Sequence, residues 1–264
     1  MPVYNSVCLI NHCLMPTKEI EKMKTYNIFG YNVFAGTVHD WDLNSKTLIN
    51  TFSPNSYGLA VKDISFKKAL LNTDILVMDG VGIAVGSLLL HGRNIKKIAG
   101  QDCFDYLIYH ANRNGWKVFF LGSSEVTLQK IVSRLKSEYS NVTVATYSPP
   151  FKNVFSDEDN RLIVDSINSF QPDVLFVGMT APKQEKWAYQ HRNAVNARII
   201  TTIGNVFDWY AGNSKRPSKI WIKLRLEWLV RIFLRPEIFR RNTKNQMMFL
   251  KDLFAYIFRL KKNI

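Results

Sequence analysis

Residues 173–204 read DVLFVGMTAPKQEKWAYQHRNAVNARIITTIG, and this stretch decides the fold. It opens with an apolar run at 173–178 and closes with another at 197–204. Between the two runs, Pro182 is placed to begin a helix, because proline is favoured in the first helical turn. Continuous apolar runs that are joined by a helix predict parallel strands buried on both faces of a sheet.

The same alternation of apolar runs and helical stretches extends over most of the chain. Ser123 or Ser124, and later Ser156, are suited to cap helices because a serine hydroxyl accepts a bond from a first-turn amide. We therefore predict an α/β fold with a doubly wound, mostly parallel, Rossmann-like sheet. Further strands are expected at 48–52, 74–79, 117–122 and 142–147, helices at 55–71, 81–91, 101–113, 124–139 and after Ser156, and an edge hairpin at 27–36.

Positive charge is concentrated at the end of the chain. The 264 residues carry a net charge of +14, and from Lys215 onward fourteen Lys or Arg stand against three acidic residues. We predict an N-terminal extension at 1–24, an α/β core at 25–213 and a basic, amphipathic helical appendage at 214–264. Two helices are expected in the appendage, at 218–234 and 237–260, separated at Pro236 because its ring cannot continue a helix.

A cationic appendage on a nearly neutral body indicates a polyanionic partner, either nucleic acid or anionic lipid. The segment LRLEWLVRIFLRPEIFRR at 224–241 places arginine and tryptophan beside large aliphatic residues, which suits a membrane interface better than nucleic acid. In the second helix an apolar stripe is predicted at Met247, Leu250, Phe254 and Ile257. A basic, solvated face on a packed helical hairpin is the alternative structural interpretation.

Several other classes of protein fit the sequence poorly. No apolar run reaches 18 residues, and no basic leader with a cleavage site is evident. Cys8, Cys13 and Cys103 form no C-x-x-C pair, which favours a reducing compartment. The histidines lack zinc-ligand spacing, and the DWD motif at 40–42 is the weak candidate for a divalent metal site, so we expect no metal.

Polar residues follow several predicted strands at their carboxyl ends, where ligands bind in open α/β sheets. Asp79 comes directly after an apolar strand, so it is a candidate general base, with a turn or helix cap as the alternative. Gln184 and Glu185 fall in the first turn of the helix that Pro182 begins, where they can bind a base or sugar hydroxyls or simply complement the helix dipole. Ser53 and Asn55 follow an earlier strand.

The glycines in GVGIAVG at 80–86 superficially suggest a dinucleotide site. Their spacing is G-x-G-x-x-x-G, and no acidic residue closes a following strand at the expected distance. An NAD-dependent oxidoreductase is therefore a secondary alternative, as is a nucleic-acid-binding module that uses the basic appendage.

A set of motifs in one order resembles the WecG/TagA/CpsF glycosyltransferases, glycosyltransferase family 26, from about residue 25 to about residue 245. PKQE-x-W, FD-x-x-AG and LEW-x-x-R are specific as a combination. The motifs are SPN (53–55), DG (79–80), IAGQD (98–102), VFFLG (118–122), PKQEKW (182–187), GNVFDWYAG (204–212), Arg216 and LEWLVR to RPE (226–237).

The resemblance implies an inverting, metal-independent transfer of a sugar from a UDP-sugar to a saccharide linked to polyprenyl pyrophosphate, at the cytoplasmic face of the membrane. The sugar would be N-acetylmannosamine, its uronic acid or glucose, and no cofactor is implied. Asp79 matches the family's proposed base. Asn55, Gln184, Asp208, Arg231 and Arg241 match further positions that are expected to bind substrate, and Ser53 stands at another such position, where a threonine is usual.

Further positions depart from the family pattern, among them RPS at 216–218, where RAP is common. Lys97 stands where arginine is common, which keeps the charge but loses the planar fork that binds phosphate at two points. Ile238 replaces another usual arginine, so Arg235 or Arg240 is expected to compensate. We still expect Lys97 and the appendage cations to stabilise the departing diphosphate. Homo-oligomer formation is left open by the sequence.

Overall fold

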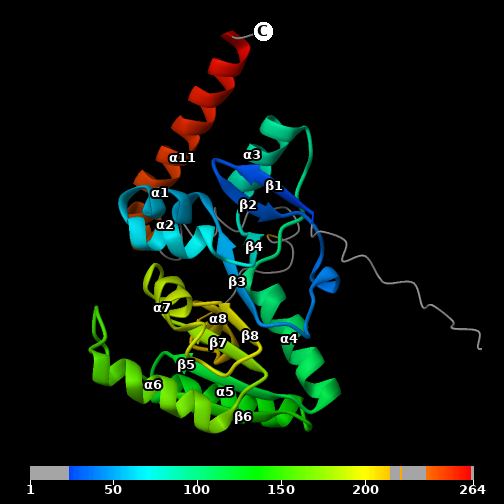
Figure 1. Cartoon of the computed structure of the whole chain (residues 1–264), viewed down its shortest axis with the longest axis vertical. Coiled ribbons are helices and arrows are strands. Elements are labelled where there is room, and N and C mark those ends of the chain that lie inside the picture. Colours follow the sequence, from blue (N-terminus) through cyan, green and yellow to red (C-terminus); the bar gives the residue numbers. More distant parts are fainter. Residues whose placement is uncertain (1–23, 215–220, 222–235, 263–264) are drawn as a thin grey trace, which may run out of the picture.

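The computed structural model describes residues 24–214, 221 and 236–262, and it confirms the predicted α/β fold (Figure 1). The sheet has the strand order β1-β2-β4-β3-β8-β7-β5-β6. All its pairings are parallel except that of β1 with β2, which form the predicted hairpin at one edge. The strands are β1 (Thr25–Ile28), β2 (Tyr31–Phe34), β3 (Thr47–Phe52), β4 (Ile75–Met78), β5 (Lys117–Gly122), β6 (Thr143–Tyr147), β7 (Val174–Gly178) and β8 (Ile199–Thr202).

Helices cover both faces of the sheet. One face packs against α4, α5 and α8, the other against α6 and α7, while α1, α2, α3 and α11 pack around the end that holds β1, β2 and β4. The helices are η1 (Val38–Asp40), α1 (Pro54–Lys62), α2 (Ile64–Leu71), α3 (Val81–His91), α4 (Gly100–Asn114), α5 (Glu125–Glu138), α6 (Asp157–Phe170), α7 (Lys183–His191), α8 (Val206–Tyr210) and α11 (Pro236–Lys262).

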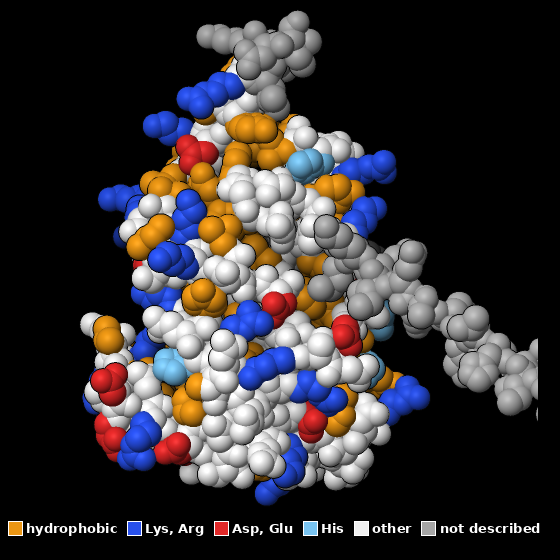
Figure 2. All heavy atoms as spheres, in the orientation of Figure 1, with side chains coloured by type: hydrophobic (Ala, Val, Ile, Leu, Met, Phe, Trp, Pro, Cys, Tyr) orange, Lys and Arg blue, Asp and Glu red, His pale blue; other side chains and the backbone are white. Residues whose placement is uncertain are grey.

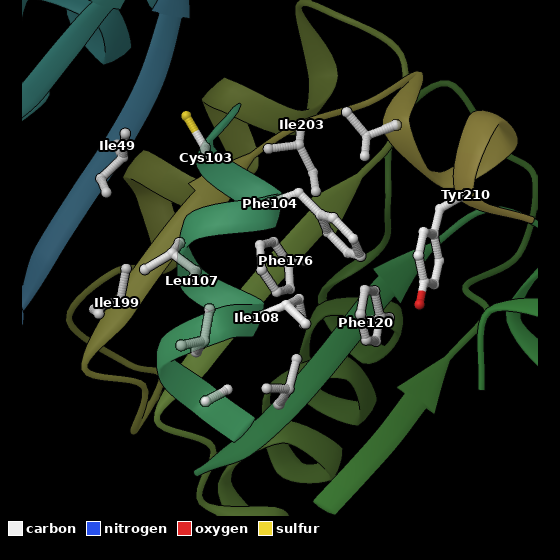
Figure 3. Packing of buried hydrophobic residues seen from close by; sticks show 14 of the residues in the cluster. Ile49, Cys103, Phe104, Leu107, Ile108, Phe120, Phe176, Ile199, Ile203 and Tyr210 are labelled. Atoms are coloured by element: carbon white, nitrogen blue, oxygen red, sulfur yellow. The ribbon is translucent and has the colours of Figure 1, made fainter. Parts of the chain in front are cut away.

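Strand alternation explains why the central strands read as continuous apolar runs. In β5, Phe120 lies in the cluster under α4, whereas Phe119 lies in the cluster on the opposite face. Figure 3 shows Phe104 and Ile108 of α4 directed toward Phe120 and Phe176. Because both faces of these strands are buried, neither face carries the polar residues that mark a half-exposed strand.

The single helix predicted at 55–71 is wrong, because the structure has two helices there. Asp63 ends α1 and caps α2, where its Oδ1 accepts a hydrogen bond from the Phe66 amide at 3.0 Å. Its Oδ2 also lies 2.8 Å from Nζ of Lys186 on α7. An aspartate with two structural roles interrupts an apolar pattern that reads as continuous.

The structure describes α11 from Pro236 to Lys262, near the range predicted for the second appendage helix, and its far end projects from the body (Figure 1). The predicted separation of two helices at Pro236 involves residues outside the described ones. The apolar stripe predicted on it is only partly buried: Met247 and Phe254 are exposed, while Leu250 and Ile257 are partly buried. The residues of α11 that enter the core are Phe249 and Leu253. The first predicted appendage helix, at 218–234, lies almost wholly outside the described residues, and the proposed domain boundaries stay predictions.

Glycines let α11 approach the body closely. A Cβ atom on Gly58 of α1 would lie 2.5 Å from the Cα of Asn245. A Cβ on Gly86 of α3 would lie 3.1 Å from the Phe249 ring, and one on Gly82 would lie 2.5 Å from Pro54. Two glycines of the GVGIAVG motif thus serve helix packing, which gives the motif a role other than dinucleotide binding.

Candidate active site

The carboxyl ends of β3, β4 and β8 surround a small cavity of about 150 Å³. Asp79 follows β4, and its amide donates a hydrogen bond to the carbonyl of Phe52, the last residue of β3, at 2.8 Å. This bond holds the aspartate backbone at the sheet edge. The cavity lining also includes Thr51, Gly100, Gln184, Thr202, Asn205 and Trp209.

A cation lies beside Asp79. The Nζ atom of Lys97 is 3.7 Å from Oδ1 of Asp79, and both side chains are partly exposed, Asp79 at 36%. Lys97 reaches this position because the next residue, Ile98, donates its amide to the Met78 carbonyl at 3.0 Å, which brings residues 97 and 98 alongside the end of β4. The structure therefore places Asp79 on a rim open to solvent, next to a positive charge.

Gln184 lines the small cavity and is held there by two hydrogen bonds. Its Oε1 accepts from the Met179 amide at 3.2 Å, and its Nε2 donates to Oε1 of Glu185 at 2.9 Å. Both side chains are buried. The amide of Gln184 therefore has a defined orientation at the cavity wall.

Glu185 lies behind Gln184 and lines neither the small cavity nor the wider cleft beside it. Burial raises the pKa of the Glu185 carboxyl to about 7. Within the described part of the chain, its Oε2 has no hydrogen-bond partner. Through its hydrogen bond Glu185 orients Gln184, and its predicted role as a substrate contact stays a prediction.

A wide cleft of about 1460 Å³ adjoins the small cavity and shares Gln184, Gly204, Asn205 and Trp209 with it. It lies at the carboxyl ends of β5, β6, β7 and β8. Asp208, which the sequence analysis predicted to contact substrate, lines this cleft. Other lining residues are Ser123, Ser124, Lys152, Phe155 and Lys183.

The segment between β6 and α6 forms one side of this cleft, and the sequence analysis did not single it out. Lys183 of α7 donates a hydrogen bond to the carbonyl of Lys152, and its Nζ lies 3.4 Å from the centre of the Phe155 ring. Burial lowers the pKa of Lys183. Lys152 is also paired with Asp159 at 2.8 Å, so the segment is tied to both α6 and α7.

Glycines end the strands next to the cleft, and one of them, Gly178, lines it. A Cβ on Gly122 of β5 would lie 2.5 Å from the carbonyl oxygen of Gly178 on β7, and Gly122 has a φ of +115°. A Cβ on Gly178 would lie 2.5 Å from the Phe207 ring. A glycine that ends an apolar strand was the sequence signal available for this part of the site.

Ser53 and Asn55 occupy structural positions. The Ser53 hydroxyl accepts a hydrogen bond from the Ser56 amide at 3.1 Å and caps α1. Oδ1 of Asn55 accepts from Nδ2 of Asn245 on α11 at 2.9 Å. Neither residue lines the small cavity or the wide cleft, so their role as substrate contacts stays a prediction.

The predicted appendage contacts fall outside what the structure describes. Arg231 lies outside the described residues, as does the side chain of Arg241. Their assignment to the substrate diphosphate stays a prediction.

The weak metal candidate DWD has local partners. Asp40 accepts hydrogen bonds from the amide and hydroxyl of Thr37, and these bonds lower the pKa of its carboxyl. Asp42 accepts from the Asn44 amide and the Ser45 hydroxyl. Both aspartates precede β3, whereas Asp79 follows the carboxyl end of β4. No cluster of three or more metal-ligand side chains occurs among the described residues, and metal independence stays a prediction.

The sheet, the carboxylate at its rim and the adjoining cleft have the arrangement of α/β enzymes, which typically bind ligands at the carboxyl ends of the strands. The chain belongs to the glycosyl transferase WecG/TagA/CpsF family, whose sequence pattern matches residues 26–263. This match confirms the resemblance and shows that the chain is a glycosyltransferase.

Named relatives extend the comparison. The chain is 30% identical over 203 residues, 77% of each protein, to N-acetylglucosaminyldiphosphoundecaprenol N-acetyl-beta-D-mannosaminyltransferase of Bacillus subtilis (strain 168). It is 28% identical to proteins of the same name from Bacillus spizizenii, over 76% of each chain, and Staphylococcus aureus (strain NCTC 8325 / PS 47), over 72% of this chain and 73% of that one. Neither the family nor these relatives support the nucleic-acid-binding or NAD-dependent alternatives.

Proposed function

We propose that this chain transfers an N-acetylmannosamine-type sugar from a UDP-sugar to N-acetylglucosamine carried on a polyprenyl diphosphate, in the synthesis of a bacterial cell-surface polysaccharide. The names of the relatives specify both sugars and the undecaprenyl carrier. The observation that carries the proposal is the position of Asp79, which is partly exposed at the sheet rim beside a cleft large enough for a nucleotide-sugar.

The volumes of the small cavity and the wide cleft indicate where the nucleotide-sugar binds. Sites for small organic ligands typically measure about 300–1,000 Å³, so a nucleotide-sugar cannot fit in the small cavity of about 150 Å³. The wide cleft, at about 1460 Å³, has room for it. The nucleotide therefore binds in the wide cleft, and the reacting sugar carbon lies at the boundary near Gln184 and Asp79.

Asp79 acts as general base in this proposal. Its carboxylate takes the proton of the acceptor hydroxyl while that oxygen forms a bond to the anomeric carbon. The bond from this carbon to the UDP oxygen breaks on the opposite side, so UDP leaves with the bonding electron pair and the anomeric configuration inverts. Gln184 offers a fixed amide near the reacting groups.

Negative charge grows on the departing diphosphate and must be stabilised in place. Lys97 supplies a cation beside Asp79, and we assign Arg231 and Arg241 to the same diphosphate. In this proposal no metal ion takes part, and the protein works at the cytoplasmic face of the membrane, with the basic appendage against anionic lipid. Within the described residues, no helix is both long and apolar enough to cross a bilayer.

The test is a panel of UDP-sugars incubated with N-acetylglucosamine linked to polyprenyl diphosphate, with the product identified by mass. We expect turnover with UDP-N-acetylmannosamine, and a loss of about 10²–10⁴-fold in rate for Asp79→Asn, the range that general bases contribute. Asp165→Asn makes the same chemical change on an exposed surface pair and should leave the rate unchanged. Equal turnover by the wild type and Asp79→Asn would remove Asp79 as the base.

A further inference from the structure

The helix α3 is apolar on two opposite sides. Ile83 and Ala84 face inward and are buried, and Leu90 packs against the same cluster. Leu88 and Leu89 are about half exposed, at 52% and 51%, and Val81 and Val85 are exposed on the same side of the helix. We call these four residues the outer face of α3: Val81, Val85, Leu88 and Leu89.

A surface helix of a globular protein normally turns charged or polar residues toward solvent, and a helix that is apolar all round is normally buried. The outer face of α3 has four aliphatic side chains at helical spacing and no charge among them. A contiguous exposed aliphatic face of this kind marks an interaction site.

Charge around the outer face favours a negatively charged partner. Residues 80–101 contain no Asp or Glu. Arg93 and Lys96 follow the end of α3, and both are exposed. Exposed cations next to the end of an apolar helix suit the interface of an anionic bilayer, where aliphatic side chains enter the headgroup boundary and cations meet the lipid phosphates.

The neighbouring helix α11 also exposes both apolar and basic side chains. It contacts α3, with Phe249 lying against Gly86. Its exposed residues also combine apolar and basic side chains: Lys244, Met247, Lys251, Phe254, Phe258 and Arg259. In Figure 2, hydrophobic and basic side chains gather over the part of the molecule where α3 and α11 lie, and most acidic side chains lie lower in the view.

We propose that the outer face of α3 inserts into the interface of an anionic membrane and thereby places Asp79 at the level of the lipid headgroups. This inference rests on the proposed function, because a lipid-linked acceptor presents its sugar at that level. Val81, the first residue of α3, is two positions after Asp79, so a helix seated on the membrane holds the candidate base beside the membrane surface. The basic appendage is then a second contact rather than the whole of the membrane-binding surface.

The first experiment measures binding of the full chain to vesicles of phosphatidylglycerol and of phosphatidylcholine. For Leu88→Ser combined with Leu89→Ser, we expect binding to the anionic vesicles to weaken at least about tenfold, because two aliphatic side chains no longer enter the interface. The matched control combines Val126→Ser on α5 with Leu162→Ser on α6, both exposed aliphatic residues, and should bind like the wild type. Unchanged binding by the α3 variant would overturn the proposal.

The second experiment compares an acceptor embedded in vesicles with a short-chain acceptor dissolved in water. The α3 variant should lose at least about tenfold in rate on the embedded acceptor and keep its rate on the dissolved one. An equal loss on both acceptors would overturn the inference. If the wild type turns over neither acceptor but still binds vesicles through α3, the proposed function is wrong. The proposal that the outer face of α3 binds the membrane is then still supported.

Light scattering addresses the rival occupant, a second copy of this chain. A wild-type oligomer that the α3 variant converts to a monomer, with vesicle binding unchanged, would assign the face to self-association and overturn the proposal. A mass that is the same for both proteins, together with weaker vesicle binding by the variant, supports it.

Discussion

The small cavity at Asp79 and the wide cleft beside it lie on the same edge of one sheet, yet they are built differently. The ends of neighbouring strands form the small cavity, Asp79 lies in its lining, and Lys97 lies beside Asp79. The wide cleft is formed by the starts of helices, by partly buried cations, and by the segment at 148–155, which is bonded to α6 and α7. The difference separates proton chemistry from nucleotide recognition: substitutions in the cavity should lower kcat, and those in the cleft should raise the donor KM.

The largest effect that would sharpen this contrast is expected for Lys97→Met. Removal of one group that stabilises charge in a transition state typically costs about 10²–10³-fold in kcat, and we expect a loss in that range with little change in donor KM. Steady-state kinetics measure both quantities. With a dissolved acceptor, Lys96→Met removes the adjacent, exposed cation and should leave both kcat and donor KM unchanged. A higher KM with an unchanged kcat would assign Lys97 to ground-state binding.

A second effect concerns Glu185, which supports the wall that the two regions share. Its pKa is raised to about 7 in the folded protein, so between about pH 4.5 and pH 7 the unfolded chain loses this proton while the folded chain keeps it. The contribution to the free energy of unfolding is present in full below about pH 4.5, falls as the pH rises, and is lost above about pH 7. Its total is about 3 kcal/mol.

Glu185→Gln removes this titration. The difference in unfolding free energy between the variant and the wild type, measured by denaturant titration, should shift in favour of the variant by up to about 3 kcal/mol from pH 4.5 to pH 8. A difference that does not vary with pH would contradict the burial of an ionisable carboxyl at this position. Glu138→Gln, at a carboxyl whose pKa is lowered in the folded protein, should give the opposite slope at lower pH.

A smaller effect tests the cleft. Asp208→Asn removes a carboxylate from the lining, and a hydrogen bond to a charged group contributes about 1.5–3 kcal/mol, so donor KM should rise about tenfold to a hundredfold. The kcat should change little, because Asp208 lies in the region assigned to recognition. The same change at the exposed Asp157 serves as the control. A fall in kcat alone would break the division between the two regions.

The smallest effect is expected away from both regions. The hydroxyl of Tyr57 on α1 donates to Oδ2 of Asp252 on α11 at 2.6 Å, and burial raises the pKa of this tyrosine. Tyr57→Phe should lower the free energy of unfolding by about 1–2 kcal/mol, as measured by denaturant titration. Activity on a dissolved acceptor should be unchanged. A kinetic defect without a loss of stability would show that α11 acts on the catalytic region.

Sequence patterns predicted the features of the fold that depend on residues close together in the chain. The buried strands, the caps at Ser124 and Ser156, and the position of Asp79 at a strand end all follow from neighbouring residues, and the structure confirms them. Patterns were less informative where distant segments meet. The ion pair of Asp63 with Lys186, the burial of Glu185 and the packing of Phe249 in the core each depend on contacts with residues far away in the chain.

Glycines illustrate the same limit. The motif at 80–86 has the composition of a nucleotide loop, yet Gly82 and Gly86 make room for Pro54 and Phe249. Gly178, which belongs to no such motif, lines the cleft in which we place the nucleotide, and Gly122 allows the close approach of its strand to Gly178. Because glycine has no side chain, another segment of the chain can pack against it. The spacing of glycines in the sequence does not identify which segment this is.

The position of Phe249 has a practical consequence for dissecting the protein. This ring is fully buried, and truncation of the chain before Pro236 would remove it from the core along with Leu253. Loss of a buried phenylalanine side chain alone typically costs about 3–5 kcal/mol, a large fraction of the stability of a domain. Chimaeras that exchange the basic tail should therefore keep the chain intact through Leu253, because a shorter protein would be inactive through misfolding whatever the tail does at the membrane.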